Sequence, residues 1–266
     1  MAVKESETKE TKSPIKNLPV RLPGQSAREH FDTFIENSIL FPIMLASVMV
    51  VFAFIEWYFC LMKVPRMPWL FTGVAFVAIA VAYWRIRVAY YKARRLRLGI
   101  TGEEAVGQFL EEQLRPLGCQ VLHDIPADGF NVDHVVIGPT GVFTVETKTH
   151  SKPAKGASSI KYDGESVSVN GLKPDRDPIV QAKAQARWIF DLLGRSTGRK
   201  AFIQPIVVYP GWFVNPQPLN AEVWVLNEKA LPAFIGNARG CTLTNEDVHL
   251  LAFHLAQYVI AKSRTR

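Results

Sequence analysis

The sequence lacks several motifs that mark common classes of enzyme and secreted protein. Its three cysteines, Cys60, Cys119 and Cys241, form no Cys-x-x-Cys pair and have no spacing typical of zinc ligands. It also has no glycine-rich phosphate-binding loop and no Gly-x-Ser-x-Gly element. These absences argue against a disulfide framework, a structural zinc site, a P-loop ATPase and an α/β-hydrolase. They are consistent with a reducing compartment.

The C-terminal part of the chain lacks net charge. The whole sequence of 266 residues has a formal charge of +7, yet residues 98–266 hold 17 Lys and Arg against 17 Asp and Glu. Residues 1–97 hold 14 basic and 7 acidic side chains, so the excess lies there. We attribute it to membrane orientation and anionic lipid rather than to a general nucleic-acid surface. Any DNA-binding surface on the C-terminal part must therefore be local.

Two long stretches lack charged residues altogether. Residues 37–55 and 67–84 are each about long enough to cross the hydrocarbon layer of a bilayer. Tryptophans and tyrosines lie at their ends, where aromatic belts form. The sequence therefore predicts two transmembrane helices with a short loop within residues 38–84. The alternative is two buried helices of a soluble protein, which would need a large core on all sides.

Basic residues near the two stretches predict how the hairpin is oriented. The connector, residues 56–66, holds only Lys63 and Arg66 as basic residues, whereas residues 85–97 hold six and no acid. By the positive-inside rule both termini lie in the cytoplasm, as in a multi-pass protein of the inner membrane. Residues 85–98 form a basic juxtamembrane linker, and residues 38–97 contact membrane lipid. Residues 1–37, with mixed charge and little apolar periodicity, are expected to be a flexible cytoplasmic tail.

The most informative stretch runs from Asn131 to Lys148. Two runs rich in β-branched residues flank Gly138-Pro-Thr-Gly141, which favours a tight type I turn and predicts a β-hairpin. With two loop residues, the numbers of paired residues sum to 279, so Asp133 faces Glu146. Because side chains alternate along a strand, Lys148 projects to the same face as both carboxylates.

Two acids placed opposite each other on a sheet repel, so this arrangement favours a positive partner. A divalent cation such as Mg²⁺ or Mn²⁺, held by Asp133 and Glu146, would relieve the repulsion. Lys148 beside it could orient or help to deprotonate a water molecule. The alternative is a salt-bridged patch on the surface of a strand.

Lysines gather just after the acidic pair. Lys152, Lys155 and Lys161 follow Lys148 and are candidate phosphate contacts. A run of this kind is more often a solvated loop.

The remaining elements predict a mixed sheet flanked by helices, an α/β fold spanning residues 99–266. Thr101 is a candidate cap for a helix from Gly102 to Leu114, on which Glu103 points inward and Glu104 toward solvent. A helix-dipole role is an equally good account of Glu103. Asp177-Pro178 opens a second helix, with Gln181 and Gln185 on one face. Two glutamines at this spacing usually face solvent.

These motifs together resemble the nuclease-related domain, a branch of the restriction-endonuclease-like superfamily that is marked by D-(x)n-(D/E)-x-K. The matching motifs, within about residues 99–215, are Gly102-Glu103, Val132-Asp133-His134, Gly138-Pro-x-Gly141, Glu146-Thr-Lys148 and Asp177-Pro178-x-x-Gln181. The resemblance implies a Mg²⁺-dependent endo- or exonuclease acting on DNA. It implies metal ligation by Asp133 and Glu146, a catalytic Lys148, and accessory catalytic roles for Glu103 and Gln181. The transmembrane hairpin lies outside the resemblance.

Three hypotheses of function follow. The first is a membrane-anchored, metal-dependent nuclease that hydrolyses DNA phosphodiesters. The second is a non-catalytic DNA- or protein-binding module that uses the same fold, which the neutral charge of the domain makes reasonable. The third is a membrane scaffold whose helices pair with partners through small residues such as Gly73 and Ala78.

Overall fold

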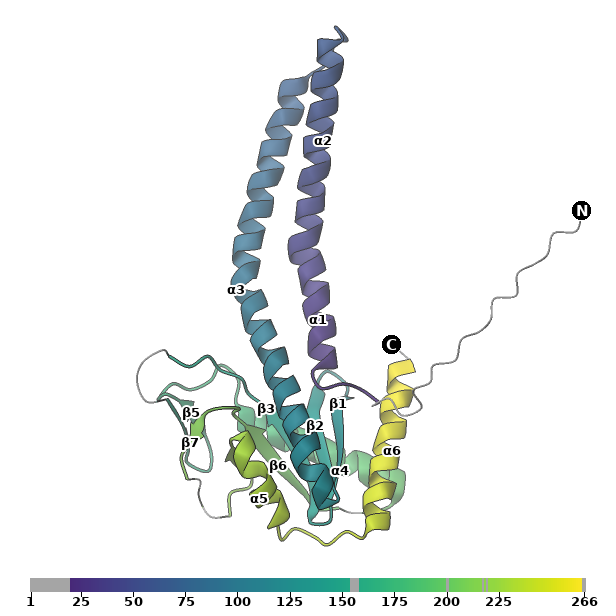
Figure 1. Ribbon diagram of the computed structural model, residues 1–266, viewed down its shortest axis with the longest axis vertical. Coiled ribbons are helices and arrows are strands. Elements are labelled where there is room, and N and C mark those ends of the chain that lie inside the picture. The colour runs from purple at the N-terminus through teal and green to yellow at the C-terminus, as the bar shows by residue number, and fades with distance from the viewer. Residues whose placement is uncertain (1–19, 154–157, 200, 217, 219, 265–266) are drawn as a thin grey trace, which may run out of the picture.

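The computed structural model describes residues 20–153, 158–199, 201–216, 218 and 220–264. A pair of long helices stands on a mixed α/β domain, and the domain lies at one end of the pair (Figure 1). The helices are α1 (Gln25–Ile35), a π-helical turn (Glu36–Leu40), α2 (Phe41–Leu61), α3 (Pro68–Leu114), α4 (Pro178–Thr197), α5 (Leu231–Gly236) and α6 (Asn245–Arg264), with 3-10 turns at Arg115–Leu117 and Glu228–Ala230. The strands are β1 (Gln120–Pro126), β2 (Asn131–Gly138), β3 (Gly141–Thr147), β4 (Ser159–Tyr162), β5 (Val167–Val169), β6 (Ile203–Val208), β7 (Phe213–Val214) and β8 (Trp224–Leu226).

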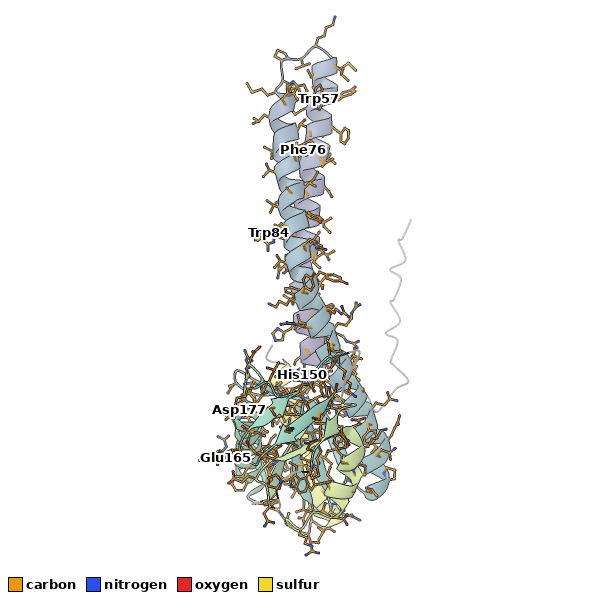
Figure 2. The ribbon with its side chains drawn as sticks, turned by 90° about the vertical axis from the view of Figure 1, so that its left-hand side faces the viewer. Trp57, Phe76, Trp84, His150, Glu165 and Asp177 are labelled. Atoms are coloured by element: carbon orange, nitrogen blue, oxygen red, sulfur yellow. The ribbon has the colours of Figure 1, made fainter. Side chains whose placement is uncertain are left out.

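The helical hairpin has small side chains inside and large ones outside. Where α2 and α3 face each other the buried residues include alanines seven positions apart: Ala46 and Ala53 on α2, and Ala75, Ala82 and Ala89 on α3. Large side chains, including Phe76 and Trp84, lie along the outside (Figure 2). Trp57 instead donates to the Thr72 hydroxyl across the hairpin, with Trp57 Nε1 3.0 Å from Thr72 Oγ1. The segments Gln25–Leu61 and Pro68–Leu117 are long and apolar enough to cross a membrane, by length and composition alone.

The predicted helix start at Gly102 is wrong. Helix α3 begins at Pro68 and continues without a break to Leu114, so the second apolar stretch and the first helix of the domain are one element. No proline interrupts residues 69–115, and a lone glycine such as Gly99 costs only about 1 kcal/mol. Thr101 does not cap the helix, because its hydroxyl donates to the carbonyl oxygen of Arg97 at 3.0 Å.

The expectation of a flexible tail is wrong for residues 20–37; residues 1–19 of that tail lie outside the described part of the chain. Residues 25–35 form α1, and Arg21, 6% exposed, binds Asp124, 4% exposed. The Arg21 Nε to Asp124 Oδ2 distance is 2.7 Å, and the backbone N–H and hydroxyl of Ser26 donate to the same oxygen, each at 2.9 Å. This buried ion pair joins the segment before the hairpin to strand β1.

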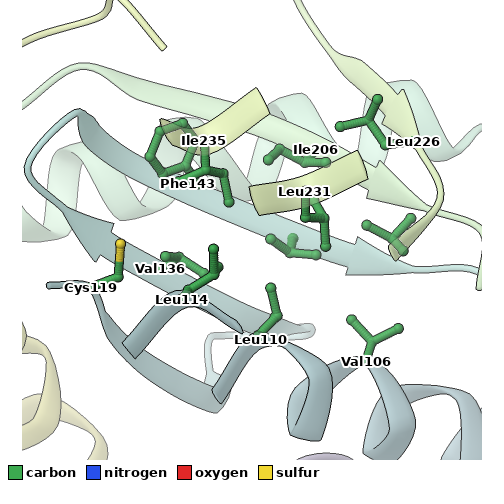
Figure 3. Close-up of a cluster of buried hydrophobic side chains, with 12 residues drawn as sticks. Val106, Leu110, Leu114, Cys119, Val136, Phe143, Ile206, Leu226, Leu231 and Ile235 are labelled. Atoms are coloured by element: carbon green, nitrogen blue, oxygen red, sulfur yellow. The ribbon is translucent and has the colours of Figure 1, made fainter. Parts of the chain in front are cut away.

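The main sheet has the order β1-β2-β3-β6-β8. Strands β1, β2 and β3 pair antiparallel, whereas β3, β6 and β8 pair parallel, so the predicted mixed sheet is confirmed. Figure 3 shows one face, where Val106, Leu110 and Leu114 of α3 pack with α5 against the sheet. On the other face α4 and α6 cover residues such as Val135 and Ile137.

A smaller sheet, in the order β5-β4-β7, lies beside the main one. Strands β4 and β5 pair antiparallel and form a small hairpin, with Asp163-Gly164 in the turn between them. Ile160 and Tyr162 on β4 pack against Ile179 on α4, together with Tyr209 and Trp212 from the segment between β6 and β7. This packing connects the start of α4 to the small sheet.

Candidate active site

The β2–β3 hairpin has the predicted register. Gly138 pairs with Gly141, Ile137 with Val142, and the ladder of pairs continues to His134 and Val145. Asp133 and Glu146 are the next positions along the two strands. Beyond the last pair the strands remain joined, because the backbone N–H of Thr147 donates to Asp133 Oδ2 at 2.7 Å.

The Glu146 carboxylate is buried, at 3% exposed, and both of its oxygens accept hydrogen bonds. Oε1 accepts from Lys148 Nζ at 2.6 Å and from Gln181 Nε2 at 2.7 Å. Oε2 accepts from Gln185 Nε2 at 2.5 Å. Lys148 Nζ also donates to Gln181 Oε1 at 2.9 Å, so the lysine, the acid and the first glutamine form a closed set of contacts.

Helix α4 positions both glutamines. Asp177 is its N-cap and accepts from the backbone N–H of Ile179 at 2.9 Å, and Pro178 fills the first turn as predicted. Gln181 and Gln185 lie one turn apart on the face directed at β3. Gln185 is 1% exposed and donates to Asn131 O at 3.0 Å in addition to Glu146.

Both glutamines therefore contact Glu146, although two glutamines at this spacing usually face solvent. Gln181 was expected at the site, and Gln185 is the contact that the sequence did not reveal. The available signal was weak: Gln185 falls four residues before Ile189, an apolar residue that is buried. An inward stripe through Gln185 and Ile189 can be drawn only once the position of α4 over β3 is known.

Glu103 and Glu104 lie in different surroundings. Burial, followed by the charges of Glu146 and Asp124, raises the pKa of Glu103 to about 7. A Cβ added at Gly24 would lie 3.4 Å from Glu103 Oε2, so the segment before α1 helps to cover this carboxyl group. Glu104 instead forms an ion pair with Arg28 of α1. The structure thus directs Glu103, and not Glu104, toward the other acids.

Asp133 has a raised pKa for similar reasons. Burial is the main cause, and the charges of Glu146 and Glu103 follow. Lys148 lowers the pKa of both Asp133 and Glu103, but its effect on each pKa is smaller than the opposing effect of Glu146. Three carboxyl groups therefore share one ammonium, and the cluster is short of positive charge.

The donor set suits a hard divalent cation. Carboxylate oxygens from Asp133 and Glu146 are the ligands that Mg²⁺ and Mn²⁺ prefer, and Mg²⁺ commonly takes one or two carboxylates together with water and substrate phosphate. Among the residues that the structure describes, no three Asp, Glu, His or Cys side chains are gathered closely enough to hold an ion alone. The site therefore fits a cation only with water or substrate completing its coordination.

Lys152, one of the predicted phosphate contacts, makes its contacts outside this cluster. Lys152 donates to the carbonyl oxygen of Gly211, and its ammonium lies 5.7 Å from the centre of the Trp212 ring. Lys161 is exposed on β4. Lys155 lies outside the described residues.

These features define a mixed α/β fold with a partly buried acid–lysine cluster at the end of its central hairpin. Residues 98–210 match the family model of the nuclease-related domain. Among solved structures, Pyrococcus furiosus SfsA in complex with Ca²⁺ is 18% identical, with a TM-score of 0.26. That match covers 46% of this chain and about half, 53%, of the SfsA chain. The comparison with curated proteins found no match.

Proposed function

We propose that this chain is a membrane-anchored, metal-dependent nuclease that hydrolyses DNA phosphodiesters. The observation that carries the proposal is the partly buried cluster of Glu146, Lys148 and Gln181, with Asp133 on the neighbouring strand end. A set of acids this short of positive charge is costly in a merely structural role. It is useful where a cation and a phosphate bind together. The nuclease-related domain supports nucleic acid as the substrate.

The side chains have distinct roles in this proposal. Asp133 and Glu146 would hold Mg²⁺ or Mn²⁺, which when bound supplies an activated water at neutral pH and a counter-charge for the phosphate. Lys148 places its ammonium beside Glu146, where it can donate to the attacking water or to a phosphate oxygen.

The other three residues support this set. Gln181 and Gln185 fix the direction of the Glu146 carboxylate through separate oxygens. Glu103, with a pKa of about 7, can accept or release a proton near neutral pH. Outside the cluster, Lys152, Lys155 and Lys161 remain predicted phosphate contacts.

We further propose that α2 and the first part of α3 span the inner membrane, with both termini in the cytoplasm. The unequal basic content of residues 56–66 and 85–97 supports this topology. The linker of residues 85–98 would then lie at an anionic lipid surface. A reporter enzyme that is active only outside the cytoplasm, fused to the C-terminus, should be inactive; an active fusion would refute the topology.

One observation favours the second candidate function, a DNA-binding module that does not cut. Both oxygens of Glu146 already have hydrogen-bond donors in Lys148, Gln181 and Gln185. A cation would have to displace or share with at least one of them. The Glu146 carboxylate is therefore fully hydrogen-bonded without metal, as a structural polar network requires.

Cleavage of a supercoiled plasmid by the purified full-length protein in detergent separates the two candidates. We expect nicked and linear products with Mg²⁺ or Mn²⁺ and none with EDTA. Binding to DNA without cleavage under all metal conditions would favour the binding module. Cleavage that EDTA leaves unchanged would refute the metal-dependent assignment.

A further inference from the structure

Four side chains form a chain of contacts that leads from the candidate active site to the outer side of α3. Thr147 Oγ1 lies 3.4 Å from His134 Nε2, and His134 Nδ1 lies 2.9 Å from His123 Nδ1. His123 Nε2 lies 3.0 Å from Glu111 Oε1. Both rings are buried, and His123 and His134 are a paired position of strands β1 and β2. The roles proposed above do not explain these contacts.

The far end of the chain fixes the direction of hydrogen donation. Glu111 also forms an ion pair with Arg115, so its carboxylate can only accept. His123 must then carry its proton on Nε2, which leaves its Nδ1 as an acceptor. His134 in turn carries its proton on Nδ1, and its Nε2 accepts from the Thr147 hydroxyl. Burial favours the neutral form of both rings, for which this is the one consistent assignment.

The near end of the chain reaches the point where backbone pairing between β2 and β3 stops. The last pair joins His134 to Val145, and Thr147 lies two residues farther along β3. Two contacts join Thr147 to β2: its backbone N–H to Asp133 and its hydroxyl to His134. On the other side of β3, Thr147 pairs with Val208 of β6. Thr147 stands between Glu146 and Lys148 in the sequence, so its position sets how these two residues face Asp133.

We propose that Glu111, His123 and His134 are positioning residues, which hold Thr147, and through it Asp133, against Glu146 by a hydrogen-bond chain of one fixed direction. The proposed effect on cleavage rests on the proposed function. The direction of hydrogen donation does not, because it follows from the acceptor at Glu111 and from the burial of two neutral rings. The two parts can therefore be tested separately.

The tautomers of the two rings test the direction. In the full-length protein labelled with ¹⁵N-histidine, long-range ¹H–¹⁵N spectra distinguish a ring with a proton on Nε2 from one with a proton on Nδ1. We expect the Nε2 form for His123 and the Nδ1 form for His134. The opposite form in either ring would overturn the proposal, whether or not the protein cuts DNA.

Substitutions at the near end test the positioning. Thr147→Val keeps the backbone N–H and the β-branched shape but removes the hydroxyl, and we expect a 10–100-fold loss of Mg²⁺-dependent cleavage. Thr147→Ser restores the hydroxyl and should restore most of the rate. Thr144→Val is the matched control, because Thr144 lies on the same strand with a buried hydroxyl that has no hydrogen-bond partner among the described residues. Equal rates for Thr147→Val and Thr144→Val would overturn the positioning role.

A wild-type protein that fails to cut DNA would refute the proposed function. The positioning of Thr147 by His134 can then be tested by a second measurement. The backbone N–H of residue 147 is held by Asp133, so its hydrogen exchange reports the same clamp. We expect exchange at least 10-fold faster in His134→Gln than in wild type, and unchanged in Thr144→Val. Exchange unchanged in His134→Gln would overturn the proposal.

Discussion

The two ends of helix α3 follow opposite rules of burial. In its first half small residues such as Ala75 and Ala82 are buried and Phe76 is exposed. In its last turns Val106 and Leu110 are buried in the core of the domain. The helix is continuous, so the change reflects its surroundings and not its backbone. A helix with apolar side chains on its exposed face is stable in lipid, whereas a helix in water is stable when its apolar side chains are buried.

The comparison also shows how the two regions are joined. Helix α3 enters the domain directly, and the other arm of the hairpin is attached through Arg21 and Asp124. Both arms are therefore fixed to the domain, close to Glu103. A fragment that begins at residue 98 would lack Arg21, so the buried carboxylate of Asp124 would lose its ion-pair partner.

The largest effect is expected from breaking this attachment. Arg21→Met should lower the free energy of unfolding by about 3–5 kcal/mol, because it leaves a buried carboxylate unpaired. Arg28→Met is the control: Arg28 pairs with Glu104 at the surface, and its loss should cost less than about 1 kcal/mol. Thermal unfolding of both variants in detergent provides the measurement. Equal melting temperatures would show that the segment before α1 is not part of the folded domain.

A matched pair of valines tests the contrast between lipid and water. Val77 on α3 and Val180 on α4 are each 64% exposed. Val77→Asp should disfavour membrane insertion by about 2.5–3.5 kcal/mol. Val180→Asp places an acid in the first turn of α4, where the helix dipole favours it, and should change stability by less than about 1 kcal/mol. Alkaline extraction of membranes measures the inserted fraction, and equal fractions for the two variants would contradict a membrane span in α3.

The pH dependence of stability tests the acid cluster. In the metal-free protein the pKa of folded Glu103 is about 7, above the ordinary 4.5, so the folded state binds the proton more tightly. Stability from this group is complete below pH 4.5 and is lost as pH rises toward 7. Glu103→Gln should therefore stabilise the metal-free protein at pH 8 by up to about 3 kcal/mol, but not at pH 4. Denaturant unfolding at both pH values is the measurement, and the same gain at both would contradict the assignment.

Glu104→Gln is the matched control for that variant. It should change the pH dependence of stability little, because Glu104 pairs with Arg28 and makes the smallest of the contributions to the raised pKa of Glu103. With Mg²⁺ present, Glu103→Gln should impair cleavage far more than Glu104→Gln. Equal rates would remove Glu103 from the site; a first-turn helix-dipole role is already excluded, because α3 begins at Pro68.

The smallest effect on stability is expected at Asp133. Asp133→Asn removes one of the repelling charges, so the metal-free protein should be as stable as wild type or slightly more stable. Cleavage should nevertheless be lost, because the variant removes a predicted metal ligand. A clear fall in stability, measured by thermal unfolding, would mean that the Thr147 N–H contact outweighs the repulsion.

The sequence predicted those features that depend on short segments. The turn at Gly138–Gly141 set the register of the hairpin and therefore the placement of Asp133, Glu146 and Lys148. The Asp177 cap gave the start of α4. Both follow from the preferences of a few adjacent residues.

The features that the sequence did not reveal depend on distant contacts. Arg21 and Asp124 are 103 residues apart, and no local pattern links them. Gln185 looked like a solvent-facing residue until α4 was placed over Glu146. The continuity of α3 was missed because Thr101, a good capping residue, also fits within a helix.

The most direct test of the central claim compares two lysines close in sequence. Rates of plasmid cleavage are measured for full-length wild type, Lys148→Met and Lys152→Met at saturating Mg²⁺. Lys148 contacts Glu146 and Gln181, whereas Lys152 contacts Gly211. The account predicts at least about a 10²-fold loss for Lys148→Met, as for removal of one transition-state donor, and less than about a 10-fold loss for Lys152→Met. A Lys148→Met protein that cuts as fast as wild type would contradict it.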